Sequence, residues 1–297
     1  MANSEKAMQK ITPFLWFDNQ AEEAVNLYTS IFNNSKTTSL MRMPDGKVLT
    51  AGFQLNGQSF AALNGGPKYK FNPAISFFVV CETEAEVDAI WSKITEGGSM
   101  LMPLNKYPWS EWYGWGQDRF GLSWQVMLNK NGGAQKFIPC LMFAGDQLVK
   151  ADEAVIFYTS IFENSKIGNI SRYTAEEPAP EGAIKYAEFN LNGQTFSIMG
   201  SAMPHNFSFN KALSFVIDAP TQEAIDYYWS KLTEGGGSES QCGWLKDKYG
   251  VSWQIVPPIL SQLLGDKDPA KAQRVMQAML KMSKITISDL EQAANQG

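Results

Sequence analysis

Hydrophobic positions recur along this chain with two different periods. Residues 11–17 form an apolar, aromatic run that ends at Asp18-Asn19, which predicts a strand leading into a helix N-terminus. Over residues 21–32 the apolar side chains follow the spacing of one helix face. Residues 33–35, Asn-Asn-Ser, then end the helical pattern. The chain therefore begins with a strand followed by an amphipathic helix.

A hairpin is predicted next. Apolar runs at 48–55 and 58–63 flank Asn56-Gly57, the preferred pair of a type I′ turn. Further elements follow from the same pattern: a strand over 74–81, a helix over 83–94 with Thr83 as N-cap and Glu86 completing a capping box, a Trp-rich loop, and a last strand over 121–128. The order β-α-β-β-(β)-α-β predicts an α+β sheet with its helices on one face.

The whole pattern occurs twice, which indicates a tandem duplication. Four blocks return in the same order: residues 23–36 as 153–166, 55–60 as 191–196, 91–98 as 229–236, and 119–126 as 248–255. We therefore divide the chain into one module at 1–132, a second at 133–258, and a tail at 259–297.

The tail has its own helix signals. Pro257-Pro258 breaks the repeated pattern, and Asp268-Pro269 predicts a helix start with an N-cap followed by proline at its first position. Residues 288–291, Ser-Asp-Leu-Glu, are a second candidate capping box. We expect these helices either to pack on the modules or to mediate a homodimer.

Composition and charge narrow the classes of partner. A net charge of −5 argues against nucleic acid, since phosphate binding needs a basic surface. No apolar run is long enough to cross a bilayer, and residues 1–10 lack the apolar core of a secretory signal. Cys81, Cys140 and Cys242 are widely spaced, as in reduced cytosolic proteins. We therefore expect a cytoplasmic protein whose nine Trp fill its core or line a small-molecule cavity.

Three strings resemble a known family: residues 11–18 (Ile-Thr-Pro-Phe-Leu-Trp-Phe-Asp), the segment from Glu23 to Phe32, and residues 247–254 (Asp-Lys-Tyr-Gly-Val-Ser-Trp-Gln). They are similar to the PhnB-like, or 3-demethylubiquinone-9 3-methyltransferase-like, group of the vicinal-oxygen-chelate superfamily, which includes glyoxalase I, bleomycin-resistance proteins and extradiol dioxygenases. The resemblance implies tandem βαβββ modules, curved mixed sheets, and a cavity on the concave face. The C-terminal helices are an extension to this fold.

The same resemblance places four metal-ligand positions of the superfamily at Thr12, Gln125, Ile138 and Gln254. Transition metals prefer imidazole, thiolate or carboxylate ligands, none of which stands at these positions. We therefore expect no metal and no cofactor. A strand, glycine-rich turn and helix suited to a methyl donor is not found in the sequence either.

Strand alternation predicts which side chains face the cavity. Gln125 and Gln254 can hydrogen-bond a neutral oxygenated ligand, or they are buried and satisfy one another. The remaining ligand-binding candidates share an aromatic or hydroxyl side chain: Thr12, Phe14, Trp16, Trp109, Trp112 and Tyr186. The Trp residues among them could stack on a planar or cationic ligand, or close the barrel as a packed lid.

Glu188 and His205 are the catalytic candidates, because Glu188 is the one carboxylate on the predicted inner face and His205 is the one histidine. Three functions remain open. The first is a metal-free cavity that binds a small aromatic or amphipathic molecule. The second is an enzyme, a lyase or an isomerase, that uses Glu188, His205 or the glutamines for proton transfer. The third is a metal-dependent glyoxalase- or dioxygenase-type enzyme with ligands supplied elsewhere in the chain.

Overall fold

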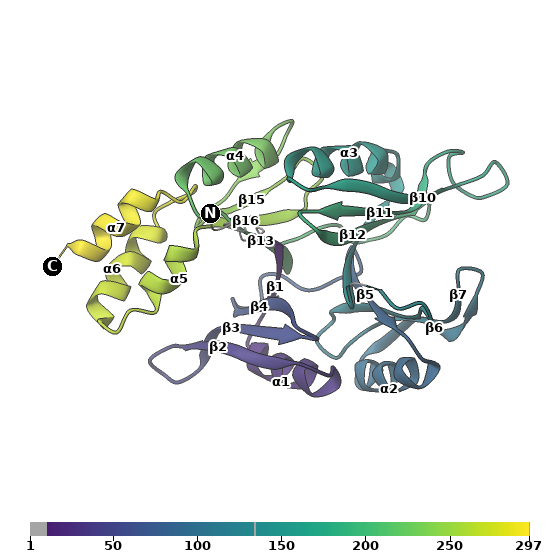
Figure 1. Ribbon diagram of the computed structural model, residues 1–297, viewed down its shortest axis with the longest axis horizontal. Coiled ribbons are helices and arrows are strands. Elements are labelled where there is room, and N and C mark those ends of the chain that lie inside the picture. Colours follow the sequence, from purple (N-terminus) through teal and green to yellow (C-terminus); the bar gives the residue numbers. More distant parts are fainter. Residues whose placement is uncertain (1–10, 134, 297) are drawn as a thin grey trace, which may run out of the picture. The chain divides into compact units, whose positions relative to one another are not determined.

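The computed structural model describes residues 11–133 and 135–296 (Figure 1). Two compact units are present among these residues: a larger one of residues 14–133 and 135–213, and a smaller one that combines residues 11–13 with residues 214–296. The chain passes from the smaller to the larger unit within its first strand.

Each sequence repeat contains two βαβββ motifs. In the first repeat, the first motif is β1 (Ile11–Phe17), α1 (Ala21–Ile31), β2 (Lys36–Arg42), β3 (Val48–Leu55) and β4 (Gln58–Asn64). The second motif is β5 (Ile75–Cys81), α2 (Glu84–Thr95), β6 (Ser99–Tyr107), β7 (Ser110–Gln117) and β8 (Ser123–Leu128).

The second repeat has the same order. Its first motif is β9 (Phe137–Ala144), a 3₁₀ helix (Gly145–Lys150), α3 (Ala151–Ile161), β10 (Lys166–Arg172), β11 (Ile184–Leu191) and β12 (Gln194–Ser201). Its second motif is β13 (Leu213–Asp218), α4 (Gln222–Thr233), β14 (Ser238–Glu239), β15 (Trp244–Lys246) and β16 (Ser252–Val256). The predicted α+β class and tandem βαβββ modules are confirmed.

An eight-stranded sheet lies entirely within the larger unit, in the order β10-β11-β12-β9-β5-β8-β7-β6. It is mixed, because β12 is parallel to β9 and β5 to β8, whereas β5 and β9 pair antiparallel at its centre. The sheet thus takes one motif from each repeat. Helix α2 packs on β7 and β8, and α3 lies along β10 and β11, as Figure 1 shows.

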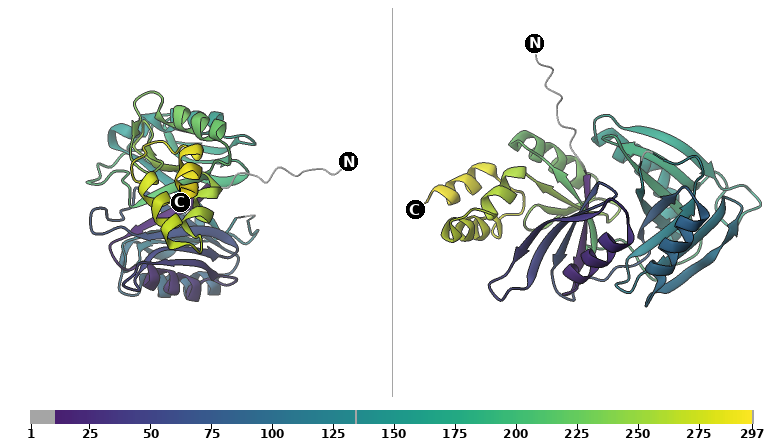
Figure 2. Two further views of the ribbon diagram at one scale, coloured as in Figure 1. Left: turned by 90° about the vertical axis from the view of Figure 1, so that its left-hand side faces the viewer. Right: turned by 60° about the horizontal axis from the view of Figure 1, so that its bottom comes forward.

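Each unit also contains a four-stranded run. The larger unit contains β1 from Phe14 onward, together with β4, β3 and β2 in that order, and this part of β1 is parallel to β4. The smaller unit contains β14-β15-β16-β13, followed by α5 (Pro258–Leu264), α6 (Pro269–Met279) and α7 (Ile287–Asn295). The three C-terminal helices, yellow in Figure 2, pack on one another. The Arg274 side chain donates to the carbonyls of Ala293 and Ala294 and ties α6 to α7.

A buried aspartate explains the repeated Asp-x-x-Gly-x-Ser-Trp-Gln string. One oxygen of Asp118 accepts hydrogen bonds from the backbone N–H groups of Phe120 and Leu122, and closes the turn before β8. The other accepts the Trp124 indole at 2.8 Å and the Tyr28 hydroxyl at 2.7 Å. Trp124 is thereby fixed in the core, and strand alternation turns the next residue, Gln125, to the opposite face.

Most predicted boundaries agree with the structure. The type I′ turn is present, since Asn56 and Gly57 both have positive φ, and Thr83 caps α2 by accepting from the Glu86 N–H. Asp268 caps α6 by accepting from the Ala270 N–H. Within the described residues, no helix is both long and apolar enough to span a bilayer.

Two predictions were wrong. The Trp-rich segment expected as a loop forms the hairpin β6–β7, and α7 begins after Thr286 instead of after Ser288. The exposed strands β2 and β10 were not predicted. Their side chains are nearly all solvent-exposed, so they show no apolar alternation for a pattern to detect.

Candidate functional site

One face of the larger unit's sheet gathers the candidate residues. Strands β5 and β9 lie side by side, and on their helix-facing side Phe77 is paired with Pro139. On the opposite side of the sheet, Ser76 is paired with Cys140 and Phe78 with Ile138. We call this second side the Gln125 face. It comprises Ser76, Phe78, Met102, Tyr107, Tyr113, Trp115, Gln125, Met127, Ile138, Cys140, Tyr186, Glu188, Ser197 and Met199.

A buried polar chain runs through the centre of this face. The Tyr113 hydroxyl donates to Gln125 Oε1 at 2.6 Å, and Gln125 Nε2 donates to Ser76 Oγ at 2.7 Å. Gln125 is only 1% exposed, so both ends of its amide are used to satisfy buried neighbours. Burial raises the pKa of the Cys140 thiol to about 11, against hydrogen bonds from Ser197, Gln125 and Ser76 that lower it. Cys140 is therefore a neutral thiol near pH 7.

Two predicted residues meet on β11. The Tyr186 hydroxyl donates to Glu188 Oε1 at 2.9 Å, and both side chains are half-buried. Burial, followed by the negative charge of Glu188, raises the pKa of Tyr186 well above its ordinary value. The phenol therefore stays protonated and orients the carboxylate on the Gln125 face.

His205 lies away from this pair. Its Nε2 is 3.0 Å from Ser201 Oγ, and its ring stacks on Phe207 with centroids 4.8 Å apart. Glu188 is opposite Ser197, four residues before Ser201 along β12. At roughly 3.3 Å per strand residue this separation is about 13 Å. The structure does not bring the two catalytic candidates together.

The predicted tryptophans of the β6–β7 hairpin lie in different places. Trp109, which is 55% exposed, stacks on Tyr107 with centroids 5.1 Å apart and meets the edge of Tyr113. Trp112 turns to the helix side, where its indole donates to Asp88 of α2 at 2.7 Å. Trp109, in the turn between β6 and β7, therefore borders the Gln125 face through its contacts with Tyr107 and Tyr113, whereas Trp112 on β7 faces α2.

The other candidates lie outside the Gln125 face. Phe14 and Trp16 are on β1, and the Trp16 indole donates to the Gly66 carbonyl at 2.8 Å and meets the edge of Tyr69. Thr12 and Gln254 belong to the smaller unit, in which Gln254 Nε2 donates to Ser214 Oγ at 3.0 Å. The amide nitrogen of each glutamine therefore donates to a serine of its own unit.

The residues at the superfamily's metal-ligand positions do not fit a transition metal. Ile138 has no donor atom, and both amide groups of Gln125 and Gln254 are neutral ligands of low affinity. Among the described residues, no three His, Cys, Asp or Glu side chains come together in a group that could hold an ion.

Several residues of the Gln125 face were not predicted from the sequence, among them Ser76, Tyr113, Ser197 and Met199. A signal for Ser76 was present, because it is the one hydroxyl in the apolar run 74–81 and returns as Ser214 in the second copy. Tyr113 was missed because the hairpin that carries it was interpreted as a loop.

Four βαβββ motifs in two repeats define a vicinal-oxygen-chelate fold. Glyoxalase I from Zea mays shows it too: it is 12% identical, has a TM-score of 0.57, and its match covers 84% of this chain and 93% of that chain. At this identity the similarity shows the fold alone.

The family is more specific. A family model described as 3-demethylubiquinone-9 3-methyltransferase matches residues 9–127 and again 135–256, so the chain belongs to that family. The PhnB protein from Bacillus cereus is 43% identical, with a TM-score of 0.40, over 41% of this chain and 100% of that one. A protein from Staphylococcus aureus is 38% identical, with a TM-score of 0.18, over 40% of this chain and 95% of that one. No curated protein matches the chain.

Proposed function

We propose that this PhnB-like protein binds a small aromatic or amphipathic molecule on the Gln125 face, without a metal. The observation that carries the proposal is a group of large apolar side chains that remain partly exposed there, among them Met102, Trp115, Met127, Tyr186 and Met199. Aromatic and thioether groups beside a few fixed polar atoms are typical of small-molecule sites.

The polar chain under this surface has a positioning role. Gln125 and Ser76 are buried, and Gln125 holds the Tyr113 hydroxyl. Tyr113 in turn supports the rings of Tyr107 and Trp109 by edge contacts. The ligand therefore contacts rings and thioethers, and the amide fixes where the rings stand.

The family's name is consistent with a ring-containing ligand, since a demethylubiquinone is a planar quinone ring, aromatic in its reduced quinol form, on an apolar chain. Methyl transfer itself has less support. The connections from strand to helix, such as Asp18 to Gln20 after β1 and Glu82 to Thr83 after β5, contain no glycine-rich turn for a nucleotide-like methyl donor.

The test uses ubiquinone-1, a short-chain benzoquinone, as the probe, with quenching of Trp fluorescence as the signal. We expect saturable binding that Tyr186→Leu weakens by about tenfold, the loss of one ring contact and its hydrogen bond. Tyr227→Leu, which removes an exposed tyrosine on α4, is the matched control and should change affinity less than about twofold. Quenching that does not saturate, or equal losses in both variants, contradicts the proposal.

A second function is favoured by the Tyr186–Glu188 hydrogen bond: an isomerase or lyase in which Glu188 removes a proton from the bound ligand. Glu188→Gln keeps the shape and the acceptor oxygen but loses the base. If the variant still binds ubiquinone-1 but no longer turns over any member of a panel of carbonyl substrates, the result supports an enzyme with Glu188 as its base. Equal turnover in both proteins would rule out Glu188 as the base.

A further inference from the structure

Glu188 is the one charged side chain on the Gln125 face, whose other residues are aromatic, aliphatic, sulfur-containing or neutral polar. Lys185 on the same strand points to the opposite side of the sheet and pairs with Glu177. Lys166 on the edge strand β10 is paired in register with Asn190, not with Glu188, and its side chain is exposed to solvent. Among the described residues, none forms an ion pair with Glu188. The face therefore carries one negative charge that no described lysine, arginine or histidine neutralises.

Rings and a thioether adjoin this carboxylate. The Tyr186 hydroxyl donates to Glu188 Oε1 at 2.9 Å, and no residue of the described ranges donates to Oε2. The Tyr186 ring meets the Phe78 ring edge-on, with centroids 5.8 Å apart, and Met199 is directly opposite Tyr186 on β12. Tyr186 and Met199 are partly exposed. The second carboxylate oxygen thus stands beside polarisable side chains, and the face of an aromatic ring attracts cations through its quadrupole.

The fold does not require a ring and a carboxylate at these positions. Strand β3 of the first repeat corresponds to β11, and when the two are aligned on their shared Leu-Asn-Gly-Gln block, Thr50 stands for Tyr186 and Gly52 for Glu188. Each strand pairs antiparallel with the strand that follows it, in the same register in both repeats. The sheet therefore forms equally well without Tyr186 and Glu188, and their presence is specific to the second repeat.

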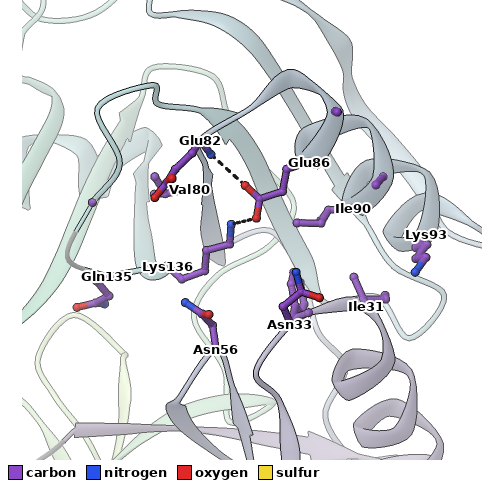
Figure 3. A pocket seen from close by; sticks show the side chains of 14 residues that line it. Ile31, Asn33, Asn56, Val80, Glu82, Glu86, Ile90, Lys93, Gln135 and Lys136 are labelled. Atoms are coloured by element: carbon purple, nitrogen blue, oxygen red, sulfur yellow. Dashed lines mark hydrogen bonds and ion pairs between the residues drawn. The ribbon is translucent and has the colours of Figure 1, made fainter.

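A pocket of about 650 Å³ beside α2 shows the opposite arrangement of charge, and it shares no residue with the Gln125 face. Figure 3 shows Lys136 pointing toward Glu86, with its Nζ 2.6 Å from Oε1, so this carboxylate is neutralised within the protein. Glu82 and Lys93 also line the pocket, and both are exposed to solvent. Two carboxylates and two ammonium groups give this pocket no preference for one ligand charge, in contrast to the Gln125 face.

Desolvation decides which ligand charge Glu188 accepts. Because Tyr186 is hydrogen-bonded to Glu188, a ligand that covers the Tyr186 ring also removes water from the carboxylate. Removing that water is costly unless a cation or new hydrogen-bond donors replace it. A neutral apolar ligand leaves this cost uncompensated, and an anion adds repulsion. An ammonium group compensates it, through charge-assisted hydrogen bonds to the carboxylate and through contact with ring faces.

We propose that the ligand of the Gln125 face is an organic cation, in which an aromatic ring carries an ammonium group on a short chain. This inference rests on the function proposed above and adds the charge of the ligand to it. The ring of the ligand lies against Phe78, Tyr186 and Met199, and its ammonium group lies at Glu188 Oε2. Glu188 is then a binding residue, and the Tyr186 hydroxyl positions its carboxylate.

The experiment compares three probes that share an indole ring and a two-carbon spacer: tryptamine, a cation, tryptophol, a neutral alcohol, and indole-3-propionate, an anion. We expect calorimetric titration of the full chain to show one tryptamine site, at least about tenfold tighter than tryptophol, with indole-3-propionate weaker still. Tryptamine that binds no tighter than tryptophol overturns the cation assignment, and saturable binding of ubiquinone-1 then leaves the proposed function intact. If none of the probes and no ubiquinone-1 binds, both proposals fail.

Two variants locate the site. Glu188→Gln keeps the shape of the side chain and an acceptor for the Tyr186 hydroxyl but removes the charge, so it should weaken tryptamine about tenfold and bring its affinity close to that of tryptophol. Glu82→Gln, the matched control, removes one carboxylate from the pocket of Figure 3 and should change tryptamine affinity less than about twofold. Equal losses in the two variants overturn the assignment, because they show a response to net charge alone. The comparison of probes in the unmodified chain tests the proposal even if Glu188→Gln does not fold.

Discussion

At the scale of single residues, the buried carboxylate of Asp118 has the most defined role. Two backbone N–H groups, the Trp124 indole and the Tyr28 hydroxyl all donate to it. Burial raises the pKa of Asp118, and these donors lower it by stabilising the carboxylate. Hydrogen bonds to Asp118 therefore connect the turn before β8, Trp124 in the core and Tyr28 of α1.

We predict that Asp118→Asn lowers the free energy of unfolding by about 2–3 kcal/mol. The asparagine NH₂ group would replace one carboxylate oxygen, so the N–H or O–H groups that donate to this oxygen would lose their acceptor. The measurement is urea denaturation followed by circular dichroism. Asp88→Asn is the matched control, since Asp88 also accepts a Trp indole but at the surface, and should cost less than about 0.5 kcal/mol. Similar losses at both sites would show that the carboxylate of Asp118 has no special role in stability.

The thiol of Cys140 gives a pH-dependent prediction. Its pKa of about 11 lies above the ordinary value, so the reactive thiolate is scarce at neutral pH and increases as pH rises. At pH 8 roughly one thiol in a thousand is ionised, and modification by iodoacetamide should accelerate about tenfold per pH unit up to about pH 11. The measurement is mass spectrometry of the Cys81→Ser/Cys242→Ser protein. Urea-unfolded protein is the control, and equal rates for folded and unfolded protein at pH 8 would contradict the burial of this thiol.

At the scale of elements, glycine lets α2 approach the sheet. A Cβ atom on Gly114 of β7 would lie 2.8 Å from the ring of Trp91 on α2, too close for any side chain without a shift of that ring or of the helix. We predict that Gly114→Ala lowers the free energy of unfolding by about 1–3 kcal/mol through overpacking. Urea denaturation measures it.

Gly133→Ala is the matched control for this prediction. A Cβ there would meet neighbours at 3.7 Å, an ordinary contact distance, and should cost less than about 0.5 kcal/mol. If the two substitutions cost the same, the close approach of α2 to β7 is not what constrains Gly114.

Elements with a clear period were predictable, and those without one were not. The buried strands β1, β3 and β8 and the helices α1 and α2 have one apolar face each, so their sequences show it. The hairpin β6–β7 could not be predicted from the sequence, because its two strands do not alternate apolar and polar residues. Met, Pro, Trp and Gly residues interrupt that alternation. That error also removed Tyr113 from the predicted site, because a residue expected in a loop cannot be assigned to a sheet face.

At the scale of the molecule, the pairing of sheet strands does not follow the sequence repeats. A repeat is recognised by its residues, whereas hydrogen bonding between β5 and β9 joins the second motif of one copy to the first motif of the next. Sequence periodicity contains no information about which strand edges meet. The Gln125 face therefore draws Ser76 and Gln125 from one repeat and Cys140 and Tyr186 from the other.

This pairing leads to a prediction for the isolated first repeat. Produced alone as residues 1–132, it keeps β5 but loses β9, and so exposes the edge of a strand whose side chains are buried on both faces in the full chain. Pairing of two copies through β5 restores an antiparallel partner, because β5 and β9 already meet in that direction. We expect a dimer by light scattering after size-exclusion chromatography, and Val79→Lys on β5 should abolish it and favour aggregation. A well-folded monomer of residues 1–132 would show that the central β5–β9 pair is dispensable for folding of the first repeat.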